Sequence, residues 1–540
     1  MHTLVRWLLV LMMVAAAKAA GAEATRPALV DAARTGDVHT VRAGLQQKGV
    51  KINETAPDGT TALHWAVQRD DVAMVELLLR AGAAPRIGSR YGVQPVAIAA
   101  VNGNVAILRL LLEAGADANA GISEGETALM VAARTGKIEP LRLLLVHGAD
   151  VNARSPRGQT ALMWAAGQNN ADAVRLLVEA GADMAARTNN PPKGRAAVMT
   201  VFTSPPPTGF TAVLFAARAG SIDATKALLD AGADVSDMLS DGQSALVVAM
   251  ANANWELAAL LLDRGADPNA SGAGWNALHQ LVRSRRPNLF YAPGPVPKGT
   301  VDSIDLVKKM VARGVDVNAR MMKNGMKDGQ RNRLNRLGAT PFFLAAKSTD
   351  LELMRVLIDA GADPRIPSAD GTTPLMVAAG LGMWYAGEDA GSLPGQEDEV
   401  LEAVKLCAAH GNEINATNAA GETPMHGAAF RGVNTVVEFL VAQGARLDQR
   451  DIRGWTPLTV ANGINYGDVF KQQPHTARLI ETLMHARGLS TEGQVADGTE
   501  CLDCIQTHAD QARAALDRDV RMEAEFAAAA ARLVQSSGGR

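Results

Sequence analysis

Residues 124–152 read EGETALMVAARTGKIEPLRLLLVHGADVN, and most of the chain repeats this pattern. The first half predicts a short helix in which the small residues Ala132 and Ala133 allow close packing, followed by a polar turn at Gly136. The second half predicts another helix, because its leucines recur at helical spacing, and Gly148 supplies the left-handed residue that ends it. We therefore expect a unit of one turn and two antiparallel helices.

This unit recurs with a period close to 33 residues. A useful marker is the apolar residue that follows Thr-Ala or Thr-Pro, which is Leu129 in the quoted stretch. Its equivalents are Leu29, Leu63, Val96, Leu162, Val213, Leu246, Leu278, Phe342, Leu375, Met425 and Leu458. One unit cannot bury its own apolar stripe, so the twelve copies must stack into a linear array.

A turn-helix-helix unit of this period, opening with a Thr-Pro-Leu-His-like motif, resembles the ankyrin repeat over residues 28–489. The resemblance implies an all-α ankyrin-repeat solenoid of about twelve repeats with short β-turn fingers. It also implies a protein partner, whose identity the repeat does not specify, because ankyrin arrays serve many unrelated partners. Residues 490–540 would form a separate C-terminal tail with an Ala-rich helix.

Composition and motifs give no support for an enzyme or a nucleic-acid binder. The net charge of −3 and the pI near 6.4 lack the basic excess typical of proteins that grip nucleic acid. No nucleophile-elbow, P-loop, zincin or dinucleotide-binding motif is present. His64, His279 and His426 fill the fourth place of the repeat motif, where histidine satisfies backbone groups between neighbouring turns. We expect no catalysis, no cofactor and no metal site.

The first 22 residues have the pattern of a secretory signal peptide. A basic start precedes an apolar run at residues 7–17, and Ala20 and Ala22 are small, as a signal peptidase requires. The run falls short of the roughly 20 residues that span a bilayer, and no later segment qualifies as a membrane span. We expect cleavage and a soluble monomer in the periplasm or outside the cell. The resemblance to exported bacterial ankyrin arrays carries the bacterial part of this expectation.

Five insertions interrupt the array, near residues 187–208, 284–300, 321–336, 383–395 and 463–474. The first is rich in proline, and the third is rich in Lys and Arg. The other three lie between the helices of one copy, on alternate copies, and contain the aromatic residues Phe290, Tyr291, Trp384, Tyr385, Tyr466 and Phe470. Either each arm folds back and buries its aromatics, or the arms form one docking surface. Three arginines, Arg283, Arg285 and Arg286, flank one arm, and the acidic residues Glu388, Asp389, Glu397, Asp398 and Glu399 lie in the next, so we expect the arms to attract one another.

The resemblance places partner contacts at finger tips and at the ends of the inner helices. The tip aromatics are Tyr91, Phe210, Trp275 and Trp455, each directly after a turn glycine or directly before one. The residues at inner-helix ends are Arg134, Gln168, Arg218, Lys347, Phe430 and Arg431. Trp65, Trp164 and Phe215 precede the buried alanines, so core packing explains them.

The tail contains the one motif with possible chemistry, Cys501 and Cys504 in a Cys-x-x-Cys spacing. A disulfide is the preferred interpretation, because an exported protein meets oxidising conditions. Covalent haem attachment would need His after the second Cys, where Ile505 stands, and zinc would lack a fourth ligand. Cys407 is expected to be a buried apolar residue.

Together these features predict a non-catalytic, exported scaffold that binds a partner protein through finger tips and the concave face. The alternative hypothesis is a redox or electron-transfer accessory protein that uses Cys501 and Cys504.

Overall fold

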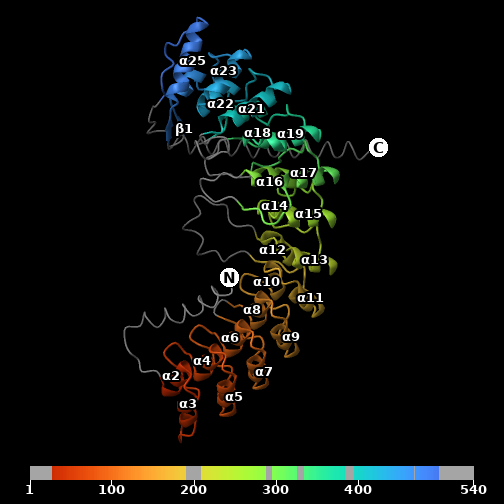
Figure 1. Ribbon diagram of the computed structural model, residues 1–540, viewed down its shortest axis with the longest axis vertical. Helices are drawn as coiled ribbons and strands as arrows, with labels where there is room; N and C mark the ends of the chain where they lie inside the picture. Colours follow the sequence, from red (N-terminus) through yellow and green to blue (C-terminus); the bar gives the residue numbers. More distant parts are fainter. Residues whose placement is uncertain are drawn as a thin grey trace. The chain divides into compact units, whose positions relative to one another are not determined.

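A computed structural model describes residues 27–122, 125–189, 208–286, 295–324, 334–383, 395–466 and 469–497. These residues form 24 helices and one two-stranded hairpin (Figure 1). The chain divides into two compact units, residues 1–195 with 207–237, and residues 196–206 with 238–540. Each unit is described on its own below.

The first unit contains six helix pairs. Its inner helices are α2 (Ala28–Thr35), α4 (Ala62–Gln68), α6 (Pro95–Asn102), α8 (Ala128–Thr135), α10 (Ala161–Gly167) and α12 (Ala212–Ala219). Its outer helices are α3 (Val38–Leu45), α5 (Val72–Arg80), α7 (Val105–Glu113), α9 (Ile138–Val146), α11 (Ala171–Glu179) and α13 (Ile222–Asp230). Each inner helix packs against the next inner helix, so the core runs between copies rather than within one copy.

The second unit also contains six pairs. Its inner helices are α14 (Ala245–Ala251), α16 (Ala277–Arg285), α18 (Pro341–Lys347), α20 (Pro374–Ala379), α22 (Pro424–Arg431) and α24 (Pro457–Asn462). Its outer helices are α15 (Trp255–Asp263), α17 (Ser303–Ala312), α19 (Leu351–Asp359), α21 (Glu397–Ala409), α23 (Asn434–Ala442) and α25 (Pro474–Ala486). The predicted all-α repeat solenoid is thus confirmed.

Local chemistry explains why the inner helices begin and end where they do. Most begin at a Thr, Ser or Asn whose side-chain oxygen accepts the N3 backbone N–H, as Thr127 does from Met130. Alanine pairs such as Ala132 and Ala133 are fully buried, so neighbouring helices approach closely. A left-handed residue ends or follows each inner helix of the first unit. It is glycine in most copies, but Asp70 and Asn169 take the same positive φ.

The insertion near 463–474 forms a hairpin on the last copy. Strands β1 (Ile464–Tyr466) and β2 (Val469–Lys471) pair antiparallel, and Ile464 forms a parallel bridge with Asp497. Gly463 is needed before β1, because its φ is 133° and the Phe470 ring occupies the space of a Cβ. Residues 490–497, which the sequence analysis gave to the tail, are hydrogen bonded to α24. The carbonyl of Gln494 accepts from Asn462, and its side-chain oxygen accepts from Thr456.

Several predicted features lie outside the described residues. They are the signal peptide at residues 1–22, the aromatic arm residues Phe290, Tyr291, Trp384 and Tyr385, and the Cys501 and Cys504 pair. For Tyr466 only the backbone is described.

A buried charge cluster ties together three copies of the second unit. The side chain of Asp350 is 0% exposed. One carboxylate oxygen accepts a hydrogen bond from Arg285 Nε at 2.6 Å, and the other accepts the backbone N–H of Leu353 in the first turn of α19. Arg285 also bonds to Ser303 and Glu352. Arg286 Nη2 lies 2.5 Å from Glu399 on α21, and Arg286 also donates to the carbonyl of Thr349. Of the charged residues expected to attract one another, Arg286 and Glu399 are paired, whereas most of the two arms lies outside the described residues.

We predict that Arg285→Gln lowers the free energy of unfolding of the second unit by about 3 kcal/mol, because it leaves a buried carboxylate without its closest charge partner. Urea unfolding, with hydrogen exchange at α16 and α19, measures the loss. The matched control is Lys308→Gln, which removes a solvent-exposed pair with Asp305 and should change stability by less than about 1 kcal/mol. Equal effects of the two substitutions would contradict the buried role of Arg285.

Candidate functional site

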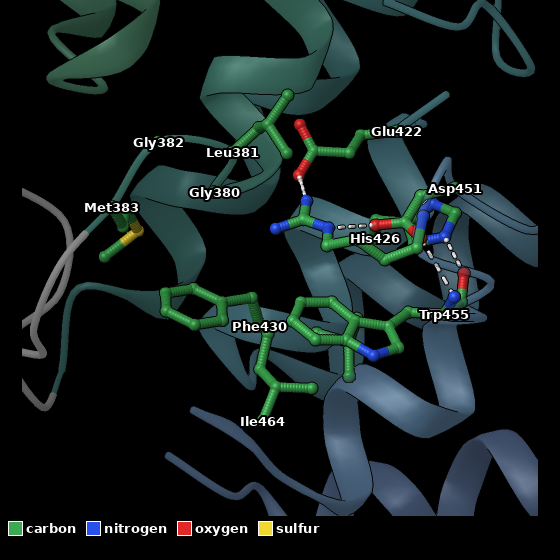
Figure 2. Close-up of a pocket in the computed structure, with 12 residues that line it drawn as sticks. Gly380, Leu381, Gly382, Met383, Glu422, His426, Phe430, Asp451, Trp455 and Ile464 are labelled. Atoms are coloured by element: carbon green, nitrogen blue, oxygen red, sulfur yellow. Dashed lines mark hydrogen bonds and ion pairs between the residues drawn. The ribbon is translucent and has the colours of Figure 1, made fainter. Parts of the chain in front are cut away.

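A groove lies between copies ten, eleven and twelve of the second unit (Figure 2). It is shallow, with a cavity volume of about 20 Å³. One wall is the turn after α20, the floor includes α22, and the other wall comes from the last finger, α24 and β1. The lining residues are Gly380, Leu381, Gly382, Met383, Glu422, His426, Phe430, Asp451, Arg453, Trp455, Val460 and Ile464. We call this surface the C-terminal groove.

Arg453 organises the polar side of the C-terminal groove. Its Nη2 donates to Glu422 Oε1 at 2.8 Å, and its Nε donates to Asp451 Oδ2 at 2.9 Å (Figure 2). The guanidinium carbon lies 4.4 Å from the centroid of the Trp455 ring, within cation–π range. Asp451 is itself buried and accepts the backbone N–H of Trp455. The charged groups here are therefore paired with one another.

Trp455 is fixed from two further directions. Its indole N–H donates to Asp497 Oδ2 at 2.9 Å, and its carbonyl accepts from His426 Nε2 at 3.1 Å. The side chain is half-buried. Trp455 consequently links the last finger to the copy before it and to the segment after it.

The apolar side of the C-terminal groove is built around Phe430. The Phe430 ring is 7% exposed, and Lys471 Nζ of β2 lies 4.1 Å from its centroid. Met383, Val460 and Ile464 are buried beneath the same groove. The apolar lining is therefore mostly buried, and the cations of Arg453 and Lys471 lie over the rings of Trp455 and Phe430.

The three motif histidines have the predicted structural role. His426 Nδ1 accepts the Thr423 backbone N–H at 3.1 Å, so the proton is on Nε2, which donates to the next finger. His64 and His279 make equivalent bonds to the carbonyls of Val93 and Ala339. Burial lowers the pKa of all three, and that of His279 to about 4. No group of metal-ligating side chains suited to a metal occurs among the residues described.

The structure brings only some predicted contact residues to this groove. Trp455 and Phe430 line it, and Arg431 follows Phe430 in the chain. Phe470 lies across the hairpin from Asn465, the residue after the lining residue Ile464. Arg431 is buried and donates to the Ala378 carbonyl at 2.6 Å, so it joins copies ten and eleven. Trp275 is half-buried, and Lys347 is 5% exposed.

The other predicted residues lie on the first unit. Arg218 is exposed, and its guanidinium carbon lies 5.0 Å from the centroid of Phe210 and 5.2 Å from that of Phe215. Phe210 is only 7% exposed, because it packs edge-on against Phe215. Arg134 covers the Trp164 ring at 5.1 Å. Gln168 and Tyr91 are exposed, Tyr91 by 55%. These residues belong to different copies of the first unit, and Arg218, Gln168 and Tyr91 remain exposed.

Sequence reasoning missed Arg453, Glu422 and Met383. The sequence did contain a signal for Arg453 and Glu422. They carry opposite charges nearly one repeat period apart, and residues at that spacing meet on adjacent fingers. Met383 carried no such signal, because its place depends on how the turn after α20 packs. Within the described ranges, no helix is long and apolar enough to cross a membrane.

The pKa of His279 predicts a pH dependence of stability. Its folded-state pKa, about 4, lies below the ordinary value of 6.5, so the folded state favours the neutral form. The stabilisation is present above pH 6.5 and is lost progressively as the pH falls toward 4, by roughly 2 to 3 kcal/mol at pH 4.5. Urea unfolding measures the free energy of unfolding at pH 7 and at pH 4.5. The difference between the two values should be smaller for His279→Asn than for the wild type. An unchanged difference would refute this assignment.

Two tryptophans provide a matched test of the indole hydrogen bond. Trp455→Phe should destabilise the second unit by about 1 kcal/mol, because the part-buried Asp497 carboxylate loses its donor. Trp275→Phe should be close to neutral, because its buried indole N–H has no hydrogen-bond partner in the structure. Urea unfolding compares the two variants, and hydrogen exchange at residues 489–497 should rise only for Trp455→Phe. The same loss in both would show that ring volume, not the bond, matters.

The comparisons with known proteins agree with this architecture. The family described as Ankyrin repeats (3 copies) matches residues 29–122, 118–188, 199–272 and 396–471, more than half of the chain. Cyclin-dependent kinase inhibitor 2A of Homo sapiens is 31% identical over 150 residues, which is 28% of this chain and 85% of that protein. Mitochondrial disaggregase of Bos taurus is 28% identical over 180 residues, 33% of this chain and 23% of the relative.

Two solved structures are also similar. The crystal structure of EF0377, an ankyrin repeat protein, is 29% identical in sequence to this chain. The alignment covers 37% of this chain and 96% of EF0377, with a TM-score of 0.33. The human ASB11 ankyrin repeat domain is 25% identical in sequence to this chain. The alignment covers 45% of this chain and 100% of the ASB11 domain, with a TM-score of 0.38. The chain spans less than a quarter of the length of the disaggregase it matches. On the family match and the repeated helix pairs, this chain belongs to the ankyrin repeat family.

Proposed function

We propose that this chain is an exported, non-catalytic scaffold that binds a partner protein. The observation that carries the proposal is the C-terminal groove, where a finger-tip residue, Trp455, and an inner-helix residue, Phe430, line one surface. Tryptophan is a frequent anchor of protein interfaces, and the apolar groove beside it suits a partner's side chain. The exposed Arg218 and Tyr91 on the first unit offer a separate contact surface for the same or another partner.

The exported location is supported by the sequence of the first 22 residues, with their basic start, apolar run and small residues at the cleavage position. We propose that the mature chain begins at Glu23 and functions as a monomer in the periplasm or outside the cell. The N-terminal sequence of the chain recovered from its host tests this part.

Affinity capture with the mature chain, from the exported fraction of its host, tests the scaffold proposal. The double variant Ile452→Ser with Phe470→Ser changes exposed apolar residues beside the groove, and Arg218→Ala with Tyr91→Ala changes the first-unit surface. We expect at least one double variant to lose about tenfold in affinity, corresponding to about 1.4 kcal/mol.

The matched control is Val146→Ser, which removes a 76% exposed apolar residue from the outer helix α9. It should capture the partner as well as the wild type does. If the folded wild-type chain captures no specific partner, the scaffold proposal fails. If all variants bind equally, the contact surface lies elsewhere on the chain.

A further inference from the structure

The inner helices of the first unit carry arginine at equivalent positions. A residue with left-handed backbone follows each of these helices, namely Gly36, Asp70, Gly103, Gly136, Asn169 and Gly220. The two residues before it stand at the same place in all six copies. These places contain no Asp or Glu, and they contain the arginines Arg34, Arg69, Arg134 and Arg218. Because successive inner helices pack against one another (Figure 1), the four arginines follow one row along the unit, which we call the arginine strip.

The outer helices of the same unit do not carry a single sign of charge. Each one from α5 to α13 has both an acidic and a basic residue. The pairs are Glu76 with Arg80, Arg109 with Glu113, Glu139 with Arg142, Asp172 with Arg175, and Asp223 with Lys226. Charges of both signs on one helix largely cancel at a distance, whereas a row of one sign attracts the opposite charge. Positive charge is therefore a property of the arginine strip and not of the unit as a whole.

Aromatic rings hold two of the guanidinium groups of the arginine strip. The guanidinium carbon of Arg134 lies 5.1 Å from the centroid of the Trp164 ring. That of Arg218 lies 5.0 Å from the centroid of Phe210 and 5.2 Å from that of Phe215. A guanidinium held over a ring loses less freedom when it binds, and it keeps N–H groups at its edge for further hydrogen bonds. The rings thus prepare these arginines to bind a carboxylate.

Two members of the arginine strip already bind carboxylates of their own chain. Arg34 is paired with Asp31 at 2.8 Å, and Arg134 with Glu126 at 3.3 Å. Arg69 and Arg218 are exposed. Arg69 donates to the carbonyl of Arg34 at 3.3 Å, and no carboxylate within the described ranges pairs with it. Since an arginine has five N–H donors, most of those of Arg69 remain for a partner.

The spacing of the arginine strip indicates the kind of partner that fits it. Packed helices lie about 10 Å apart, so Arg69, Arg134 and Arg218, which belong to alternate copies, are spaced by about 20 Å. An extended peptide advances about 3.3 Å per residue, so acidic side chains six residues apart match this spacing. Duplex DNA has one charge per about 1.7 Å of its axis, which is far denser, and the chain has a net charge of −3. An acidic polypeptide segment therefore fits better than a nucleic acid.

We propose that the arginine strip binds an extended acidic segment of a partner protein. Carboxylates of that segment pair with Arg69 and Arg218, because the guanidinium fork matches the two oxygens of a carboxylate. The inference rests on the proposed scaffold function, and it names the chemistry of the partner and the part of the first unit that binds it.

Fluorescence anisotropy with a defined peptide tests the arginine strip in the full chain. The probe is a labelled peptide of six Glu-Ser-Gly triplets, and the reference peptide has Gln in place of Glu. We expect the Glu peptide to bind at least tenfold more tightly than the Gln peptide at low salt. High salt should release it, because salt screens exposed charge pairs.

Two double variants with the same change of charge locate the binding surface. Arg69→Gln with Arg218→Gln should weaken binding of the Glu peptide at least tenfold. The matched control is Arg109→Gln with Arg142→Gln, which removes two exposed arginines from the outer helices α7 and α9 and should change the affinity less than twofold. Thermal unfolding followed by circular dichroism checks that both variants keep the fold.

Equal binding of the two peptides, or an equal loss in both double variants, would overturn the proposal. Tighter binding of a thymidine oligonucleotide than of the Glu peptide would overturn it in favour of a nucleic acid. This failure is distinct from that of the scaffold function, which fails if the host yields no partner. A captured partner that binds the Arg69→Gln, Arg218→Gln chain as tightly as the wild type would overturn only the role of the arginine strip.

Discussion

The whole structure depends on one constraint, which is that no helix pair can bury its inner face alone. The inner helices of each unit are so short and so rich in alanine that their apolar surface is covered mainly by the next inner helix. The buried residues of α8, from Ala128 to Ala133, show how completely this happens, since six consecutive residues are buried. Stability in such an array is shared among neighbouring interfaces rather than concentrated in a central core.

Polar groups adapt to the same constraint in two ways. Some links between copies are uncharged, such as the His64 ring between its own Thr61 and the Val93 carbonyl of the next finger. Others are charged, and the fully buried Asp350 pairs with Arg285 and Arg286, which are themselves partly exposed. Thr349 beside it has a φ of 51°, which is costly for a β-branched residue and indicates that the surrounding contacts enforce this backbone.

Most of the fold could be predicted from sequence because the repeat restates the same local rules twelve times. The helix pairs, the Thr caps and the role of His279 all follow from residue type and spacing. Part of the candidate site was also accessible, since Trp455 and Phe430 occupy recognisable positions in the repeat. The tip position of Phe210 did not reveal its burial, because the Phe215 ring that covers it comes from the following helix. The pairing of Arg453 with Glu422 was missed for a similar reason, since it needs two fingers in register.

The hairpin at the end of the second unit has a consequence for how such an array can lengthen. Strand β1 and residues 490–497 lie against α24, the last inner helix described, and Thr456 and Asn462 are already bonded to Gln494. Duplication of the last copy would therefore separate these partners and leave two hairpins competing for one set of bonds. New repeats would be accommodated only by insertion between interior copies, where each end of the added unit meets a surface that it is built to cover.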